Sequence, residues 1–281
     1  MNRLVMGVEY NGSQFSGWQW QRGLRTVQSV LETALATVAN EPVTVVCAGR
    51  TDSGVHALEQ VVHMDTTVVR SHRSWLMGAN TYLPDDVRVL WVQDAQAGFH
   101  ARYSAIARFY RYVILNRPIQ SALRYRQVTW CYPVLDVERM HVAAQCLVGD
   151  HDFTSFRAQG CQSKSPRRFM HFIKVYQEGD LITIDLCANA FVHHMVRNIA
   201  GTLMEIGQGK HAAAWCEQLL DKKDRRLAAA TAAPQSEKKL SNTKKLLKTR
   251  IQKRKTEKNT DKQSQIKDIV YQFERKKLQN T

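Results

Sequence analysis

The sequence lacks the cysteine patterns of metal-binding or disulfide-linked domains. Six cysteines are scattered over 281 residues, no Cys-x-x-Cys pair occurs, and no close cysteine–histidine pairing has zinc-ligand spacing. We therefore expect neither a zinc ribbon nor a disulfide scaffold, and the isolated thiols favour a reducing, cytoplasmic environment. No apolar run reaches membrane-spanning length and no signal peptide is recognisable, so we expect no contact with a membrane.

Acidic side chains are comparatively few, because 40 Lys and Arg residues stand against 25 Asp and Glu residues. Residues 235–281 hold 15 of the basic and 5 of the acidic ones, which is +10 of the net charge of +15. We expect a Lys-rich tail here, disordered over 236–262, with a basic amphipathic helix around 266–273. The basic composition is therefore weak evidence that residues 1–234 bind RNA.

Apolar periodicity predicts a strand–helix–strand–strand order that occurs twice. Thr26 and Asp136 have the position of helix caps, and residues 192–206 form the strongest helical pattern. This order indicates an α+β fold with two related halves of mixed or antiparallel sheet and helices on one face. We expect the halves at 1–107 and 108–234, followed by the tail at 235–281.

Residues 48–57, Ala-Gly-Arg-Thr-Asp-Ser-Gly-Val-His-Ala, contain the most informative pattern. A turn between two predicted strands holds Asp52 two residues after Arg50, with Gly49 and Gly54 on either side. The pattern fits a solvated hairpin whose carboxylate bonds its own turn amides. It fits equally a carboxylate held beside a cation for chemistry.

An aromatic segment precedes this turn and has two interpretations. Phe15, Trp18 and Trp20 lie among glutamines and Arg22. Such a mixture can stack on unpaired bases and hydrogen-bond to them, but the same residues also suit a packed loop.

The string from Gly49 to Ala57 closely resembles the active-site motif of the TruA family of tRNA pseudouridine synthases. Further similar motifs follow in the family's order, at residues 15–19, 99–105, 108–112, 152–157 and 189–198. The resemblance covers most of residues 5–234. It implies the pseudouridine synthase fold, with an active-site cleft between the two halves.

The resemblance also implies an activity, the isomerisation of uridine to pseudouridine at positions 38–40 of the tRNA anticodon stem-loop by a homodimer. The C1′–N1 bond breaks, the base turns, C1′ bonds to C5, and the C5 proton leaves. No redox change occurs, so no cofactor and no metal is expected. The matching carboxylate is Asp52, which acts either as a nucleophile or as a base.

Three further residues match family positions near the base. Tyr110 matches a tyrosine that stacks on the base, Arg50 an arginine that helps the flipped base to enter, and Arg197 an arginine paired with the catalytic aspartate. From the residues alone, Tyr110 suits a core strand, Arg197 a solvated helix, and Arg50 a pair with Asp52. Other basic residues are candidates for tRNA phosphate contacts: Arg102, Arg108, Arg111, Arg157, Lys164, Arg167 and Arg168.

The histidines offer no recognisable metal pair. His193 and His194 are adjacent in a predicted helix, so their side chains are expected to point about 100° apart. His56 and His63 have no evident partner. We interpret all four as structural or RNA-facing and assign no metal.

The sequence departs from the family after Pro234, where an apolar strand is normal. Residues 235–240, Gln-Ser-Glu-Lys-Lys-Leu, have no β-branched run, so we expect the strand to be missing and activity to be impaired. A non-catalytic RNA-binding protein on the same scaffold is the alternative. A metal-dependent phosphodiesterase using Asp52, His56 and His63 is more remote, because their spacing does not support metal binding.

Overall fold

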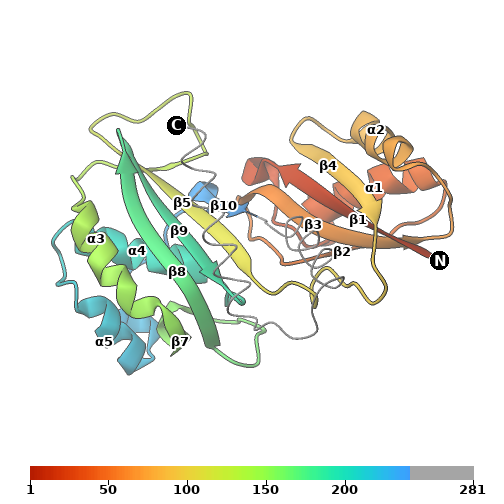
Figure 1. Cartoon of the computed structure of the whole chain (residues 1–281). Coiled ribbons are helices and arrows are strands. Elements are labelled where there is room, and N and C mark those ends of the chain that lie inside the picture. Colours follow the sequence, from red (N-terminus) through yellow and green to blue (C-terminus); the bar gives the residue numbers. More distant parts are fainter. Residues whose placement is uncertain (241–281) are drawn as a thin grey trace, which may run out of the picture. The chain divides into compact units, whose positions relative to one another are not determined.

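The computed structural model describes residues 1–240, and these lie in one compact unit that extends to Ser241 (Figure 1). The strands form a ten-stranded mixed sheet in the order β4-β1-β3-β10-β5-β9-β8-β7, with β2 beside β3 and β6 beside β5. The predicted helix at 266–273 and the predicted disorder over 241–262 lie outside the described residues. The predicted disorder over 236–240 is wrong, because these residues lie in a 3₁₀ turn and a strand.

The described residues form ten strands and five α-helices. The strands are β1 (Asn2–Tyr10), β2 (Val45–Cys47), β3 (His56–Thr66), β4 (Val87–Asp94), β5 (Arg108–Asn116), β6 (Thr129–Cys131), β7 (Gly149–Asp152), β8 (Arg167–Glu178), β9 (Leu181–Ala188) and β10 (Glu237–Leu240). The helices are α1 (Val27–Ala39), α2 (His72–Tyr82), α3 (Val137–Ala144), α4 (Met195–Gly207) and α5 (Trp215–Lys222). Among the described residues, no helix is long and apolar enough to cross a membrane.

Two hydrophobic clusters support the sheet. The first joins β1, β3 and β4 to α1 and α2, and the second joins β5, β8 and β9 to α3, α4 and α5 (Figure 1). The side-chain oxygen of Thr26 accepts a hydrogen bond from the Ser29 amide in a capping box. This bond explains where α1 begins. The α+β fold class is confirmed; the domain boundary near residue 107 stays a prediction.

The expectation that no strand follows Pro234 is wrong. Residues Glu237–Leu240 form β10, which pairs in parallel with β3 and antiparallel with β5 in the middle of the sheet. Anchors before the strand explain why a sequence of low β-propensity is extended here. His56 Nε2 lies 2.9 Å from the Gln235 carbonyl, and the Ser236 hydroxyl bonds Thr129, whose hydroxyl also bonds Tyr112.

The inward-facing side chains of β10 are both ionisable. Lys239 is opposite Tyr110 and Glu237 is opposite Tyr112, so both point to the face that carries the hydrophobic clusters. The Lys239 ammonium donates to the Gln60 side chain and, at 2.8 Å, to the Gly49 carbonyl. Lys239 therefore ties the central strand to the start of the Asp52 turn, although burial lowers its pKa to about 7.

Glu237 makes stability depend on pH. Burial, and then the nearby charge of Asp52, raise the pKa of Glu237 to about 8, while Arg197 opposes the shift. The unfolded chain therefore ionises first, and the free energy of unfolding falls as the pH rises from about 4.5 to 8. At pH 8 we expect Glu237→Gln to unfold about 5 °C higher than the parent, and at pH 5 to differ little.

Circular dichroism at pH 5, 6.5 and 8 measures this effect. Glu9→Gln, which changes an exposed carboxylate on β1, serves as the matched control and should follow the parent at each pH. A Glu237→Gln variant with the parent's pH dependence would contradict the assignment.

One other prediction for local structure needs correction. The predicted helix at 192–206 begins only at Met195. The strands β6 and β7 have three and four residues, too few for an alternation that the sequence would show.

Candidate active site

The turn that carries Asp52 connects β2 to β3 and rests on the segment that follows β1. The Trp18 amide donates to the Thr51 carbonyl at 3.0 Å, the Ser53 hydroxyl donates to the Phe15 carbonyl at 3.2 Å, and Tyr10 OH lies 2.7 Å from Thr51 Oγ1. Phe15 and Trp18 are buried, which supports the packed-loop interpretation for both, whereas Trp20 is exposed. The aromatic segment thus supports the turn.

Two glycines allow this close approach. Gly17 and Gly54 have φ of 88° and 80°, in the left-handed region where other residues are strained. A Cβ on Gly17 would lie 3.0 Å from the Thr51 carbonyl oxygen, and one on Gly54 would lie 3.1 Å from Pro234. Both positions therefore need glycine if Asp52 is to keep its place.

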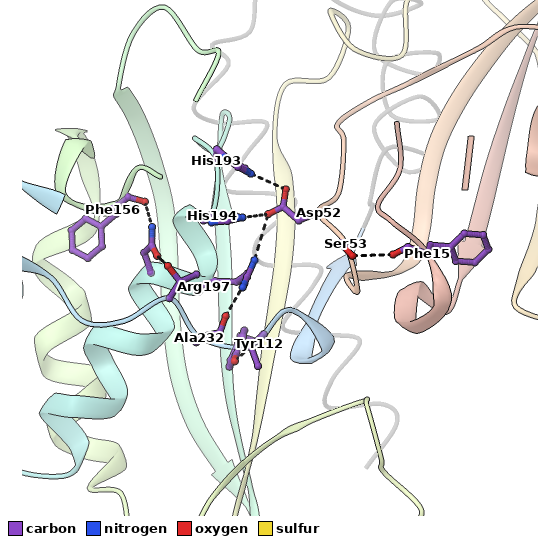
Figure 2. Close-up of polar contacts among 12 residues, drawn as sticks. Phe15, Asp52, Ser53, Tyr112, Phe156, His193, His194, Arg197 and Ala232 are labelled. Atoms are coloured by element: carbon purple, nitrogen blue, oxygen red, sulfur yellow. Dashed lines mark hydrogen bonds and ion pairs between the residues drawn. The ribbon is translucent and has the colours of Figure 1, made fainter. Parts of the chain in front are cut away.

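The Asp52 carboxylate faces three cationic or potentially cationic groups from the other half of the chain (Figure 2). Its Oδ1 lies 3.4 Å from His193 Nε2, and its Oδ2 lies 3.4 Å from His194 Nε2 and 4.0 Å from Arg197 Nη1. The Asp52 side chain remains 29% exposed. The carboxylate is thus oriented by the protein and still accessible to a ligand.

The prediction that His193 and His194 point apart is wrong. Both residues precede α4, and His194 has φ of 61° and ψ of 9°, which is left-handed rather than helical. The two rings consequently lie side by side, with centroids 3.9 Å apart. This conformation costs about 1–2 kcal/mol for a non-glycine residue, so the surrounding structure must impose it. Burial lowers the pKa of His194, with Asp52 opposing that shift.

Two contacts hold the guanidinium of Arg197, one with a backbone carbonyl and one with Asp52. Its Nε donates to the Ala232 carbonyl at 2.7 Å, and its guanidinium faces Asp52 with the side chain only 13% exposed (Figure 2). Since screening is weak for a mostly buried cation, Arg197 stabilises the ionised carboxylate more than an exposed arginine would. The alternative of a solvated helix residue does not hold for Arg197.

Tyr110 lies on β5, beside the central strand. Its ring packs edge-to-face on Phe191 with centroids 4.9 Å apart, and the residue is buried. Burial raises the pKa of its hydroxyl, and the charges of Glu237 and Asp52 act in the same direction. The hydroxyl is therefore neutral over the physiological pH range.

Arg50 does not pair with Asp52 in the described part of the chain. The residue is exposed, and its guanidinium lies 3.4 Å from the Gln162 side-chain oxygen. Arg197 instead supplies the cation for Asp52. Arg50 therefore remains available at the surface beside the turn.

Most of the predicted phosphate-binding arginines make contacts within the protein. Arg108 donates to the Ala48 and Asn189 carbonyls, and Arg111 forms a bidentate pair with Asp185. Arg157 and Arg168 both hold the loop around Ser163. Arg102, Lys164 and Arg167 are exposed.

His56 and His63 are structural. The Gly12 amide donates to His56 Nδ1 at 3.1 Å, and the Ala101 amide donates to His63 Nδ1 at 3.1 Å. Burial lowers the pKa of both rings, to about 4 for His63. Neither ring is among the groups around Asp52, so the phosphodiesterase hypothesis loses two of its three residues.

A known family has the same sequence pattern over most of this chain. The profile of tRNA pseudouridine synthases matches residues 6–104 and 143–243. The chain belongs to this family. Because the match runs through β10, the unusual strand falls within the family's domain, and the expectation of impaired activity has no support.

Several relatives carry the same name, tRNA pseudouridine synthase A. The protein of Methylococcus capsulatus is 61% identical over 83% of this chain and 86% of its own length. That of Nitrosococcus oceani is 54% identical over 83% and 90%, and that of Cronobacter sakazakii is 55% identical over 82% and 85%. The chain is thus similar to nearly whole pseudouridine synthases.

Two features of the site were missed by sequence analysis. The histidine pair was assigned to a helix, although adjacent histidines just before a helical pattern also fit its first turn or cap. Lys239 was assigned to the tail because a lysine rarely occupies a central strand. No local signal in the sequence reveals its contact with Gly49.

Proposed function

We propose that this pseudouridine synthase isomerises uridine at positions 38–40 of the tRNA anticodon stem-loop, with Asp52 as the catalytic carboxylate. The observation that carries the proposal is the placement of Asp52, partly exposed and facing Arg197 within 4.0 Å. A carboxylate in this position is oriented by its neighbours and still accessible to an extruded nucleotide.

Asp52 initiates the reaction at the sugar. It either attacks C1′ as the N1 bond breaks or removes a sugar proton, and in both routes the negative charge passes to the departing uracil. The base then turns, and C5 bonds to C1′ as the Asp52–C1′ bond breaks or, in the second route, as the sugar regains its proton. C5 then loses its proton and N1 gains one, which restores the conjugated uracil ring, so the sequence of steps needs no external oxidant or reductant.

The neighbouring residues act on the charge and on the base. Arg197 holds the Asp52 carboxylate toward the second half of the chain, and its Ala232 contact fixes the guanidinium. Tyr110, neutral and packed on Phe191, offers a ring edge or face to the uracil. Arg50, exposed beside the turn, enters the stack in place of the extruded nucleotide.

The exposed cations supply affinity for the phosphates of tRNA. Arg102 together with Lys164 and Arg167, which pairs with Asp150 at the surface, takes this role, while Arg108, Arg111, Arg157 and Arg168 mainly hold other parts of the protein in place. A homodimer acting on one tRNA and a cytoplasmic location belong to the same proposal. Free thiols in all six cysteines agree with such a location.

Release of tritium from C5-tritiated tRNA tests the proposal. We expect release from a tRNA with uridine at positions 38–40 and none when all three are cytidines, because the label is on uracil C5 and no labelled uracil then stands at these positions. The tRNA with three cytidines still carries labelled uridines outside these positions and is therefore the control. Release from that control tRNA at the same rate would contradict the assigned positions.

A further inference from the structure

Two histidines and the proposed catalytic carboxylate form a cluster that the isomerisation does not require. Asp52, His193 and His194 (Figure 2) each offer one ligand atom, and these atoms all lie within 4.8 Å of one another. Among the described residues, this is the one such group of three or more histidine, cysteine or acidic side chains.

The distances in the cluster are poor for hydrogen bonds. Both Nε2 atoms lie 3.4 Å from a carboxylate oxygen, whereas charge-assisted N–H···O bonds are about 2.7–2.9 Å long. In a tetrahedral zinc site with bonds of about 2.0–2.1 Å, neighbouring ligand atoms lie about 3.4 Å apart. The two histidine–carboxylate separations therefore match those of a metal site, and the three ligand atoms lie within 4.8 Å of one another.

The backbone conformation is the second observation that sets the pair apart. The left-handed His194 brings both rings to the same side, although a helical residue at this position would separate them. Helix α4 therefore begins at Met195, and both histidines that face Asp52 precede it. Since His193 is 42% exposed, the fourth position of a tetrahedral ion would be open to water.

We propose that Asp52, His193 and His194 bind a divalent transition-metal cation such as Zn²⁺, and that the bound ion reversibly blocks the active site. Two imidazoles and one carboxylate favour Zn²⁺, Co²⁺ or Ni²⁺ over Mg²⁺, which prefers oxygen ligands and retains its water. Arg197, 4.0 Å from Asp52, repels the cation and limits its affinity. The ion is therefore an inhibitor and not a resident cofactor.

Binding of Zn²⁺ to the full chain, measured by titration calorimetry with Co²⁺ absorption as a second readout, tests the site. We expect one ion per chain, and affinity at least about tenfold lower in His193→Ala, His193→Gln and His194→Ala. His211→Ala is the matched control, because His211 Nε2 contacts Glu205 at 3.3 Å but has no second histidine beside it. This variant should keep the parent's affinity and activity.

The inhibitory half of the proposal rests on the proposed function and has a separate readout. Zn²⁺ should suppress tritium release over the concentration range in which it binds, a chelator should restore release, and millimolar Mg²⁺ should have no such effect. Absence of Zn²⁺ binding, or binding unchanged in all three histidine variants, overturns the site. Release that continues with the site filled overturns the inhibition. A chain that binds Zn²⁺ through these residues but never releases tritium retains the site and refutes the proposed function.

Discussion

Asp52→Asn is expected to reduce the rate of tritium release by about 10²–10⁴-fold, while the dissociation constant for tRNA changes by less than about threefold. The amide nearly preserves the shape of the side chain and its contacts with His193 and His194. It removes the charge that serves either as nucleophile or as base. The loss should therefore appear in kcat, with the dissociation constant for tRNA nearly unchanged.

Single-turnover release and filter binding measure the two quantities. Asp85→Asn is the matched control, because its carboxylate is fully exposed in a local pair with Arg88 and lies outside the Asp52 cluster. Retention of more than a tenth of the parent's rate in Asp52→Asn would exclude Asp52 as the catalytic group. Loss of tRNA binding in the same variant would indicate a role in binding instead.

A chain that ends at Pro234 is expected to lose cooperative folding, whereas a chain that ends at Ser241 should unfold like the full chain. The shorter chain lacks β10, so β3 and β5 lose their shared neighbour at Lys238 and Lys239. Several buried backbone groups would have no partner, at about 1–3 kcal/mol each. The sum exceeds about 5 kcal/mol, which is comparable with the whole stability of many domains.

Thermal unfolding followed by circular dichroism separates the two chains, and tritium release provides a second measurement. The chain ending at Ser241 is the control, because it contains every strand of the sheet. Equal transition temperatures for both chains would mean that β10 contributes nothing to stability. Activity in the chain ending at Pro234 would lead to the same conclusion.

Sequence patterns identified the elements whose local signals agree with their surroundings. Thr26 precedes an apolar stripe, and the structure has α1 with that residue as its cap. On β1, the alternate residues Leu4, Met6, Val8 and Tyr10 likewise lie in the first hydrophobic cluster. In both cases the residues that favour the element also bury it, so local and tertiary preferences coincide.

β10 shows where such patterns fail. Its Glu-Lys-Lys-Leu sequence has the composition of a solvated segment, and only tertiary contacts place it at the centre of the sheet. The residues that fix it, His56, Tyr112 and Thr129, are distant in sequence. A single sequence carries no record of these pairings.

The active site was predictable in its residue types but not in its geometry. The family motif indicated Asp52 and Arg197, and the structure has the two side chains 4.0 Å apart. The arrangement of His193 and His194 depends on the left-handed backbone conformation of His194. The residue type histidine does not predict that conformation. The contacts that bind Arg108 and Arg111 to carbonyls and to Asp185 also emerge only from the fold.

The position of β10 has a consequence for synthesis on the ribosome. This strand is the last of the ten to emerge, yet it fills the space between β3 and β5. Until then, the nascent chain carries two strands with open edges, and such edges are the sites at which neighbouring chains associate. Slow translation near codon 237 would prolong this vulnerable stage, and chaperones that shield extended segments would have their greatest effect there.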